Sequence, residues 1–483
     1  MNDEDPNRLA NHGREDDVMD RKDDVKDREK RTRREAKDRL IYAALVDDVV
    51  AAAPVLSEAD IAAFQALGTS EEFARKVFAK FQKQCPRRAP ERGSTCVNDQ
   101  AAGETTQEAA REAAAPDPQF EGLLARHRDC HQVEHFDWTS RFVKKKEIGQ
   151  GGQGVVYLIE CTDDAFVGNR ALKILSPQPY GSLDLYRRDM QRVRDVAALV
   201  HQIYHDNLIY VERFESRKDI YMMVMRLVDG FDLQRLLDPQ LIDNLKRTVD
   251  ERRWRDQLHD AVFAPRGEAR WGLAPGVAVS IIQKCLRGLS ALHDKGIVHC
   301  DIKPSNIMVD CYGSIRLIDI GSAFQIGFRP ERPAWTPRYA PPEVLEDRGW
   351  TKQGDLASLG YVLIELLSGQ TGPMGSLDNS NSAHALDKVT RCELADCKRR
   401  LPDRLEEIVP SKALECKSLK ELCRKLTDPD PARRFASAEE AFDWTVKFQA
   451  ELVCARLSLP WVKVIKFLVT DAKRAMASAD NSA

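Results

Sequence analysis

The segment IVHCDIKPSNIMV, residues 297–309, carries the most informative pattern in the chain. Between two apolar runs it places a carboxylate, a cation and an amide at the spacing D-x-K-x-x-N, namely Asp301, Lys303 and Asn306. A carboxylate can orient a hydroxyl, a cation can neutralise developing negative charge, and an amide oxygen can help to hold a divalent cation. In-line phosphoryl transfer needs this set, because its catalysis consists mostly of positioning and charge neutralisation.

Two further clusters supply groups that this segment lacks. The run LIDIG, residues 317–321, places Asp319 at the end of a β-type run as a second acid for a divalent cation. Upstream, IGQGGQGVV, residues 148–156, is a G-x-G-x-x-G-x-V string that leads into a strand pattern. A dinucleotide-binding glycine string opens a helix instead. The pattern therefore favours a glycine-rich hairpin whose backbone N–H groups face phosphates. Lys173 lies in an apolar strand pattern and needs an anionic partner, which phosphate oxygens would supply.

The order of these motifs resembles that of the eukaryotic-type (Hanks-type) serine/threonine protein kinases, over residues 142–446. The resemblance implies an α+β, bilobal fold with a small β-rich N-lobe and a larger helical C-lobe, preceded here by a helical N-terminal extension. It also implies ATP and Mg²⁺ as cofactors and a protein with a Ser or Thr acceptor as partner. Short β-branched runs before residue 229 and helical patterns from residue 276 onward agree with this architecture.

The resemblance also implies roles for the matching residues. Asp301 would orient the substrate hydroxyl or accept its proton, and Lys303 would meet the γ-phosphate. Asn306 would complete this catalytic group and, with Asp319, hold Mg²⁺. The residues implied to bind the nucleotide are Ile148, Gly149, Gly151, Gly154, Val156, Lys173, Met225 and Val228.

Three further matches lie in the second half of the chain. Thr336–Tyr339 resembles the loop that seats the acceptor Ser or Thr. Glu343 is expected to pair with Arg434, which we interpret as a structural pair. Asp355 begins a segment that matches the buried helix anchoring the catalytic loop.

One departure from the family concerns regulation. Cys300 occupies the position of the family's Arg, which gathers an activation-loop phosphate through a charge-assisted pair that cysteine cannot form. Residues 319–343 offer only Ser322, Thr336 and Tyr339 as hydroxyls. We therefore predict activity that is independent of activation-loop phosphorylation.

A second departure concerns the partner of Lys173. The family supplies a Glu from a helix, but the helical pattern at 186–196 contains no Glu. Asp195 is the best-placed carboxylate and Asp189 the next, and the sequence leaves open which of them pairs with Lys173. Gln153 also replaces the common aromatic at the tip of the glycine-rich loop.

Composition divides the chain into regions. Residues 1–40 are highly charged with both signs and predict disorder or a solvated helix. Residues 41–85 predict a small helical region, 86–118 a linker, and 447–483 a C-terminal helical extension. Residues 238–275 form a charged insert. Partner docking through the N-terminal extension or this insert, and plain surface elaboration, both remain open.

Charge and hydropathy exclude several classes. The chain has 73 Lys and Arg against 76 Asp and Glu, a net charge of −3. Because it has no excess of positive charge, we expect no nucleic-acid binding. The apolar stretch at 452–469 is interrupted by charges and a proline, so we expect no transmembrane segment. A polar start without an apolar run and twelve cysteines without a C-x-x-C pair predict a cytoplasmic protein with reduced thiols.

Three histidines at helical spacing, His127, His131 and His135, raise the question of a metal site. A single helix cannot wrap a tetrahedral ion, so we favour a solvated polar helix face.

Two rival functions also remain. A pseudokinase scaffold is suggested by Cys300 and the missing Glu. A small-molecule kinase of the aminoglycoside-phosphotransferase kind is disfavoured by Lys303 and the later motifs.

Overall fold

The computed structural model describes residues 118–133, 142–163, 166–259, 262–266, 270–328, 330–331, 334–370, 387–454 and 469–473. The chain divides into two compact units, Met1–Ala110 and Arg111–Ala483, and all described residues belong to the second. The predictions for residues 1–40 and 41–85, and for the linker 86–118 apart from its last residue, lie outside the described residues.

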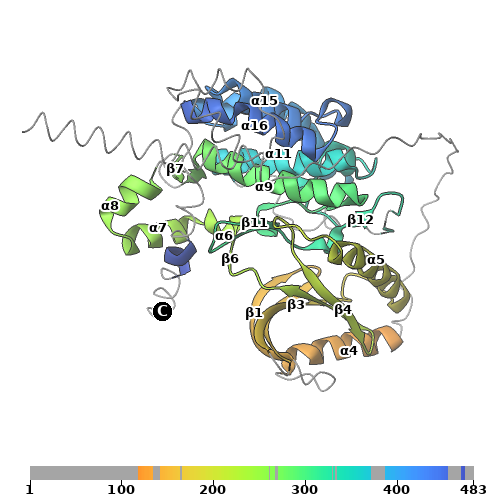
Figure 1. The fold of residues 1–483 in the computed structure, drawn as a ribbon. Helices are drawn as coiled ribbons and strands as arrows, with labels where there is room; N and C mark the ends of the chain where they lie inside the picture. Colours follow the sequence, from red (N-terminus) through yellow and green to blue (C-terminus); the bar gives the residue numbers. More distant parts are fainter. Residues whose placement is uncertain are drawn as a thin grey trace, which may run out of the picture. The chain divides into compact units, whose positions relative to one another are not determined.

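An antiparallel five-stranded sheet in the order β1-β2-β3-β5-β4 forms the first lobe (Figure 1). Three of its strands, β2, β3 and β5, contain the β-branched runs of the sequence, which suit a pleated and half-buried surface. Lys218 and Asp219, with φ of 49° and 63°, form the tight turn between the last two strands. The strands are β1 Phe142–Gly151, β2 Gly154–Asp163, β3 Phe166–Leu175, β4 Val211–Arg217 and β5 Ile220–Arg226.

Helix α5, Leu183–His201, packs beside this sheet through one apolar face (Figure 1). Tyr186, Met190 and Val193 are buried at spacings of four and three residues, the periodicity of an amphipathic helix. The hydroxyl of Ser182 accepts a hydrogen bond from the Leu185 N–H at 3.3 Å and caps the helix. The opposite side of α5 is thereby presented to the space between the lobes.

Helix α4, Pro118–Gln132, precedes the sheet and contacts α5 and β5. Phe120 and Leu123 are buried in the main apolar core. The Arg126 Nε donates to the carbonyl of Lys218 at 3.2 Å. The expected helical extension is thus an integral cover of the first lobe.

The second lobe is helical and is centred on α9 and α11 (Figure 1). Residues 354–368 of α11 are all buried. Helix α16 continues through the predicted domain boundary at residue 446. None of the described helices is long and apolar enough to cross a bilayer. The helices are α6 Leu233–Leu236, α7 Pro239–Thr248, α8 Glu251–Arg253, α9 Pro275–Asp294, α10 Pro342–Leu345, α11 Lys352–Ser368, α12 Lys388–Arg400, α13 Leu405–Ile408, α14 Ser411–Leu414, α15 Lys417–Leu426 and α16 Ala438–Cys454.

Short strands and turns connect these helices and carry several of the predicted site residues. The strands pair as β11-β10-β6, β12-β9 and β7-β8. They are β6 Gly230–Asp232, β7 Phe263–Pro265, β8 Trp271–Leu273, β9 Ile297–Val298, β10 Ile307–Asp310, β11 Ile315–Leu317 and β12 Phe324–Gln325. The short helical turns are η1 Trp254–Leu258, η2 Pro304–Asn306, η3 Ile320–Ser322, η4 Pro337–Tyr339, η7 Leu401–Asp403 and η8 Pro431–Arg433.

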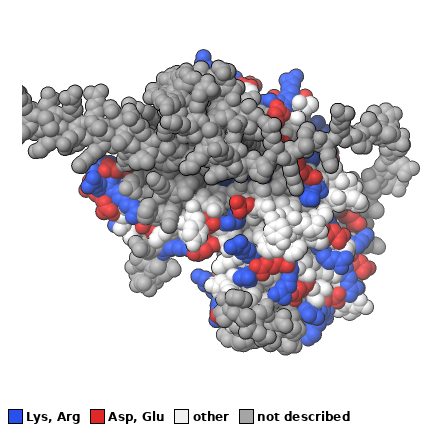
Figure 2. Space-filling view, in the orientation of Figure 1, with Lys and Arg blue, Asp and Glu red and all other residues white. Residues whose placement is uncertain are grey.

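The 238–275 insert is a folded part of the second lobe. Its α7, η1 and β7-β8 hairpin contribute buried apolar side chains, and Trp254 and Trp271 meet edge to face with ring centroids 5.7 Å apart. The C-terminal residues 469–473 are helical, and Val469 and Ala472 are buried in the same core. On the face seen in Figure 2, basic and acidic side chains are interspersed over the described surface.

Candidate active site

The carboxylate of Asp355 in α11 holds the loop that follows β9. It accepts hydrogen bonds from the backbone N–H groups of His299 at 2.8 Å and Cys300 at 2.9 Å, and from the His293 ring at 2.9 Å. Burial raises the pKa of Asp355, but the hydrogen bonds and charge of the histidines outweigh it and lower that pKa below its usual value. An ionised carboxylate inside the lobe therefore fixes the backbone just before Asp301.

Asp301 lies at the centre of a hydrogen-bonded group and is only 7% exposed. One of its carboxylate oxygens accepts from Lys303 Nζ at 2.8 Å and from Asn306 Nδ2 at 3.1 Å. The other accepts from the Thr336 hydroxyl at 2.7 Å, and Lys303 also donates to that hydroxyl at 2.8 Å. Asp301 and Lys303 can therefore engage the same hydroxyl group.

Lys173 of β3 faces Asp319 across the cleft. The Lys173 side chain is buried, and its Nζ lies 2.5 Å from the Asp319 Oδ1. Burial raises the pKa of Asp319, but the charge and hydrogen bond of Lys173, with the Gly321 N–H, lower it to about 2. Asp319 is consequently a full anion at neutral pH. It sits in the left-handed region with φ 62° and ψ 81°, directly after β11.

Gln153 crosses from the glycine-rich loop to the segment after Asp319. Its Oε1 accepts from Lys173 Nζ at 3.0 Å, and its Nε2 donates to the Ser322 hydroxyl at 2.6 Å. The loop needs glycine at position 154, because φ is 142° there and a Cβ would lie 2.0 Å from the Ile174 carbonyl oxygen. The replacement of an aromatic by Gln at this tip therefore adds a polar bridge over the cleft.

The expectation that an α5 carboxylate pairs with Lys173 is wrong. Asp189 instead forms an ion pair with Arg192 at 2.6 Å and accepts from the Tyr180 hydroxyl at 2.5 Å. Asp195 accepts from the Gln191 amide at 2.8 Å on an exposed part of the helix. Local partners within reach hold both carboxylates away from β3.

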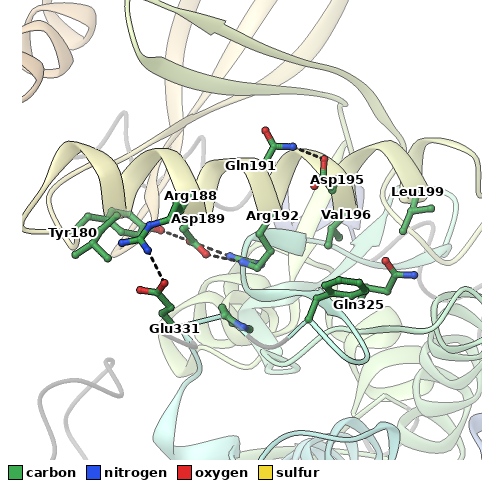
Figure 3. Close-up of a pocket in the computed structure, with 13 residues that line it drawn as sticks. Tyr180, Arg188, Asp189, Gln191, Arg192, Asp195, Val196, Leu199, Gln325 and Glu331 are labelled. Carbon is green, nitrogen blue, oxygen red and sulfur yellow. Dashed lines mark hydrogen bonds and ion pairs between the residues drawn. The ribbon is translucent and has the colours of Figure 1, made fainter.

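The charged group that α5 extends into this region is the guanidinium of Arg192 (Figure 3). Its Nη2 donates to the Gly321 carbonyl at 2.9 Å, and its Nη1 donates to the Ala323 carbonyl. Both carbonyls belong to the segment directly after Asp319. Helix α5 thus holds this segment through a cation, while Lys173 is held by Asp319 and Gln153.

All twelve residues predicted for the site line one open cleft of about 1440 Å³ between the two lobes. The loop residues enter from β1 and β2, and Lys173 enters from β3. Met225 lies at the end of β5, and Val228 lies in the connection directly after β5, here called the hinge. The acidic and amide residues come from the β9–β11 loops. The residues are Ile148, Gly149, Gly151, Gly154, Val156, Lys173, Met225, Val228, Asp301, Lys303, Asn306 and Asp319.

The donor set at the end of β11 fits a hard divalent cation. Asp319 supplies an ionised carboxylate, and Asn306 uses its Nδ2 toward the Asp301 carbonyl at 2.8 Å. The Asn306 Oδ1 is therefore the atom that a cation would use. Oxygen ligands of this kind match the preference of Mg²⁺.

Cys300 is a buried neutral thiol. It packs with Val298 and Phe324 in a small apolar cluster and adopts φ 67°. Burial, reinforced by the nearby Asp355 carboxylate, raises the pKa of the Cys300 thiol well above its ordinary value.

Glu343 and Arg434 form a bidentate ion pair just after the segment that carries Thr336. Arg434 donates to the two carboxylate oxygens of Glu343 at 2.6 and 2.9 Å, and both side chains are buried. The expected pair is therefore present. Breaking such a buried pair is strongly destabilising, because one charge is then left without compensation.

The expectation of a solvated histidine face on the first helix is wrong. His127 is only 5% exposed, and its Nε2 lies 3.3 Å from the His131 Nε2. The His131 Nδ1 lies 2.7 Å from the Tyr157 hydroxyl of β2. His135 lies outside the described residues. This face of α4 is packed on the sheet, a tertiary contact that helical spacing alone cannot reveal.

Arg192 and Lys473 line the cleft, but the sequence analysis assigned neither of them to the site. Arg192 follows Asp189 by three residues, a spacing that allows a helix ion pair and could have signalled that Asp189 is already engaged. Lys473, which also lines the cleft, gives no such signal because it is far from the motifs in sequence.

Comparison with known proteins agrees with the geometry. The family model for the protein kinase domain matches residues 142–445. Serine/threonine-protein kinase PrkC of Bacillus subtilis is 26% identical over 306 residues, which are 62% of this chain and 39% of that protein. Probable serine/threonine-protein kinase PknB of Lactococcus lactis is 28% identical over 242 residues, 48% of this chain and 32% of that protein. The chain therefore aligns with less than half the length of either relative.

Among solved structures, the kinase domain of Mycobacterium tuberculosis PknI is 23% identical with a TM-score of 0.43. The match covers 65% of this chain and 96% of that one. The family model alone spans more than half of the chain, with the expected residues gathered in its cleft. The chain belongs to the protein kinase domain family.

Proposed function

We propose that this protein is a serine/threonine protein kinase that transfers the γ-phosphoryl group of ATP to Ser or Thr hydroxyls of protein substrates. The observation that carries the proposal is the shared hydroxyl contact of Asp301 and Lys303 on Thr336, opposite the Lys173–Asp319 pair. The names of the relatives support the same activity.

In this proposal the chain positions two reactants and neutralises charge. Asp301 orients the acceptor hydroxyl and takes its proton, while Lys303 stabilises charge on the transferred group. Lys173 holds the α- and β-phosphates under the glycine-rich loop. Asn306 and Asp319 would hold Mg²⁺, which would offset the negative charge of the phosphates. The hinge residues Met225 and Val228, with Ile148 and Val156, cover the adenine.

Activity that is independent of activation-loop phosphorylation is part of the proposal. Cys300 is buried and neutral, so it cannot gather a phosphate. The three hydroxyls of residues 319–343 are already engaged: Ser322 with Gln153, Thr336 with Asp301, and Tyr339 with Glu365 at 2.8 Å. Phosphatase treatment should therefore leave activity unchanged.

The pseudokinase alternative is not favoured, because Lys173, Asp301, Asn306 and Asp319 are retained in one cleft. Its support is the absence of an α5 carboxylate beside Lys173 within the described residues. A small-molecule kinase is opposed by the Thr336 segment and the Glu343–Arg434 pair. We further propose a cytoplasmic location and a protein partner that presents the acceptor.

The test is phosphoryl transfer from labelled ATP with Mg²⁺ to the protein itself and to a basic protein substrate, with Asp301→Asn beside the wild type. Label on Ser or Thr that the variant lacks is the expected result. Nucleotide binding without label in the wild type would favour the pseudokinase. Turnover of a hydroxylated metabolite alone would favour the small-molecule kinase.

A further inference from the structure

The C-terminal residues 469–473 pack against the second lobe close to the hinge (Figure 1). Val469 and Ala472 are fully buried in the main core, one helical turn apart on one face. Asp471 forms an ion pair at 2.6 Å with Arg253 of the 238–275 insert. The Asp471 side chain is only 8% exposed, so this pair is well shielded from water.

Lys473 continues from this anchor into the nucleotide cleft. Its ammonium pairs with Asp229, which directly follows the hinge residue Val228, and it lines the same cleft as the glycine-rich loop. Neither side chain of this pair is buried. The cation thus stands at the open edge of the site, where a bound nucleotide meets solvent.

The charges at the hinge end of the cleft are balanced only with this residue. Residues 226–238 contribute two arginines, Arg226 and Arg235, and three aspartates, Asp229, Asp232 and Asp238. Lys473 brings the cations to three and the local net charge to zero. Without it the rim is negative, and a nucleotide polyphosphate is negative as well.

We propose that the insert docks the chain's own C-terminal segment, and that this segment supplies Lys473 as a nucleotide-binding residue of the cleft. Residues 469–473 are here called the strap, and the insert holds the strap in place. Lys473 of the strap then raises the affinity of the cleft for anionic adenine nucleotides. The inference rests on the proposed nucleotide-dependent function for its ligand, whereas the docking of the strap stands on the packing alone.

The binding test uses the full chain and a fluorescent ADP analogue with Mg²⁺. Lys473→Ala should raise the Kd about two- to five-fold, as expected for an exposed charge pair, and high salt should shrink the difference. Adding Asp229→Asn to Lys473→Ala should recover most of the loss. Lys295→Ala removes an exposed lysine at the end of α9, away from the hinge, and should leave the Kd unchanged.

The docking test measures amide hydrogen exchange of residues 469–473. Arg253→Glu should accelerate exchange there, and Arg253→Glu combined with Asp471→Arg should restore protection. An unchanged Kd in Lys473→Ala, with the wild type binding nucleotide, would overturn the nucleotide role alone. A wild type that binds no nucleotide would overturn both that role and the proposed function. Unprotected residues 469–473 in the wild type would overturn the strap.

Discussion

The guanidinium of Arg192 donates a hydrogen bond to the carbonyl oxygen of Gly321 at 2.9 Å. Helix α5 thus binds the segment after Asp319 through a positively charged side chain. The same side chain donates to the Ala323 carbonyl and pairs with Asp189 at 2.6 Å. Figure 3 shows this group along the inner side of the helix. A positive group bound to backbone carbonyls can fix Asp319 without touching Lys173.

Arg192→Ala should lower kcat about ten-fold or more, because hydrogen bonds to a charged group contribute about 1.5–3 kcal/mol each. The Kd for nucleotide should change less, since Lys173 and Asp319 remain. Arg192→Lys keeps one donor and should recover part of kcat. The matched control is Arg188→Ala, which removes an exposed arginine of the same helix paired with Glu331. Equal kcat values in Arg192→Ala and the control would contradict the inference that Arg192 positions the segment after Asp319.

Gln153→Ala should tighten nucleotide binding. The Gln153 side chain accepts a hydrogen bond from Lys173. A nucleotide phosphate must bind the same ammonium group, so Gln153 competes with the phosphate for Lys173. Losing a competing hydrogen bond of about 0.5–1.5 kcal/mol corresponds to a Kd lower by about two- to twelve-fold. Calorimetric titration with Mg-ADP measures it, with Gln178→Ala, which removes an exposed glutamine that does not line the cleft, as the control. A weaker affinity in Gln153→Ala would mean that Gln153 helps to bind phosphate.

Packing of α4 should weaken below neutral pH. Burial, with the neighbouring His131, lowers the pKa of His127 from 6.5 to about 4. Between these values the unfolded chain binds more protons than the folded one, so stability falls as the pH decreases from about 6.5 to 4. Thermal unfolding across this range should show a steeper loss in the wild type than in His127→Leu. Parallel curves for the two proteins would rule out His127 as the cause.

Thiol alkylation at neutral pH should spare Cys300 in the native protein. The reactive species is the thiolate, and burial raises the pKa of Cys300 while excluding the reagent. Cys392 is exposed and should be labelled. Mass spectrometry of peptides from native and denatured protein gives the two extents of labelling. Rapid native labelling of Cys300 would show that this loop opens.

Local patterns in the sequence were enough to predict the two lobes and the motif residues, whereas the resemblance to the kinase family predicted which residues line the cleft. Strand and helix periodicities reflect which faces must be buried, and the glycine and D-x-K-x-x-N strings reflect backbone shapes fixed by a few residues. The resemblance then ordered these pieces into one fold. The twelve predicted residues accordingly lie together.

Side-chain partners were harder to predict, because a long polar side chain pairs with whichever group the packing brings within reach. Asp189 faces Arg192 and Tyr180 instead of Lys173, and His127 lies against the sheet instead of water. Both predictions used helical spacing, which gives the face of a helix and leaves its neighbours undetermined.

The sequence by itself determined the family fold, the motif residues and the lack of a charged residue at position 300. Only the tertiary structure decided that Arg192 grips the Gly321 segment, that Gln153 bridges the cleft, and that Lys473 reaches the hinge. These contacts join groups up to 244 residues apart in the chain. Their geometry exists only once both lobes, the insert and the C-terminal segment have packed, because burial rather than local propensity sets those distances.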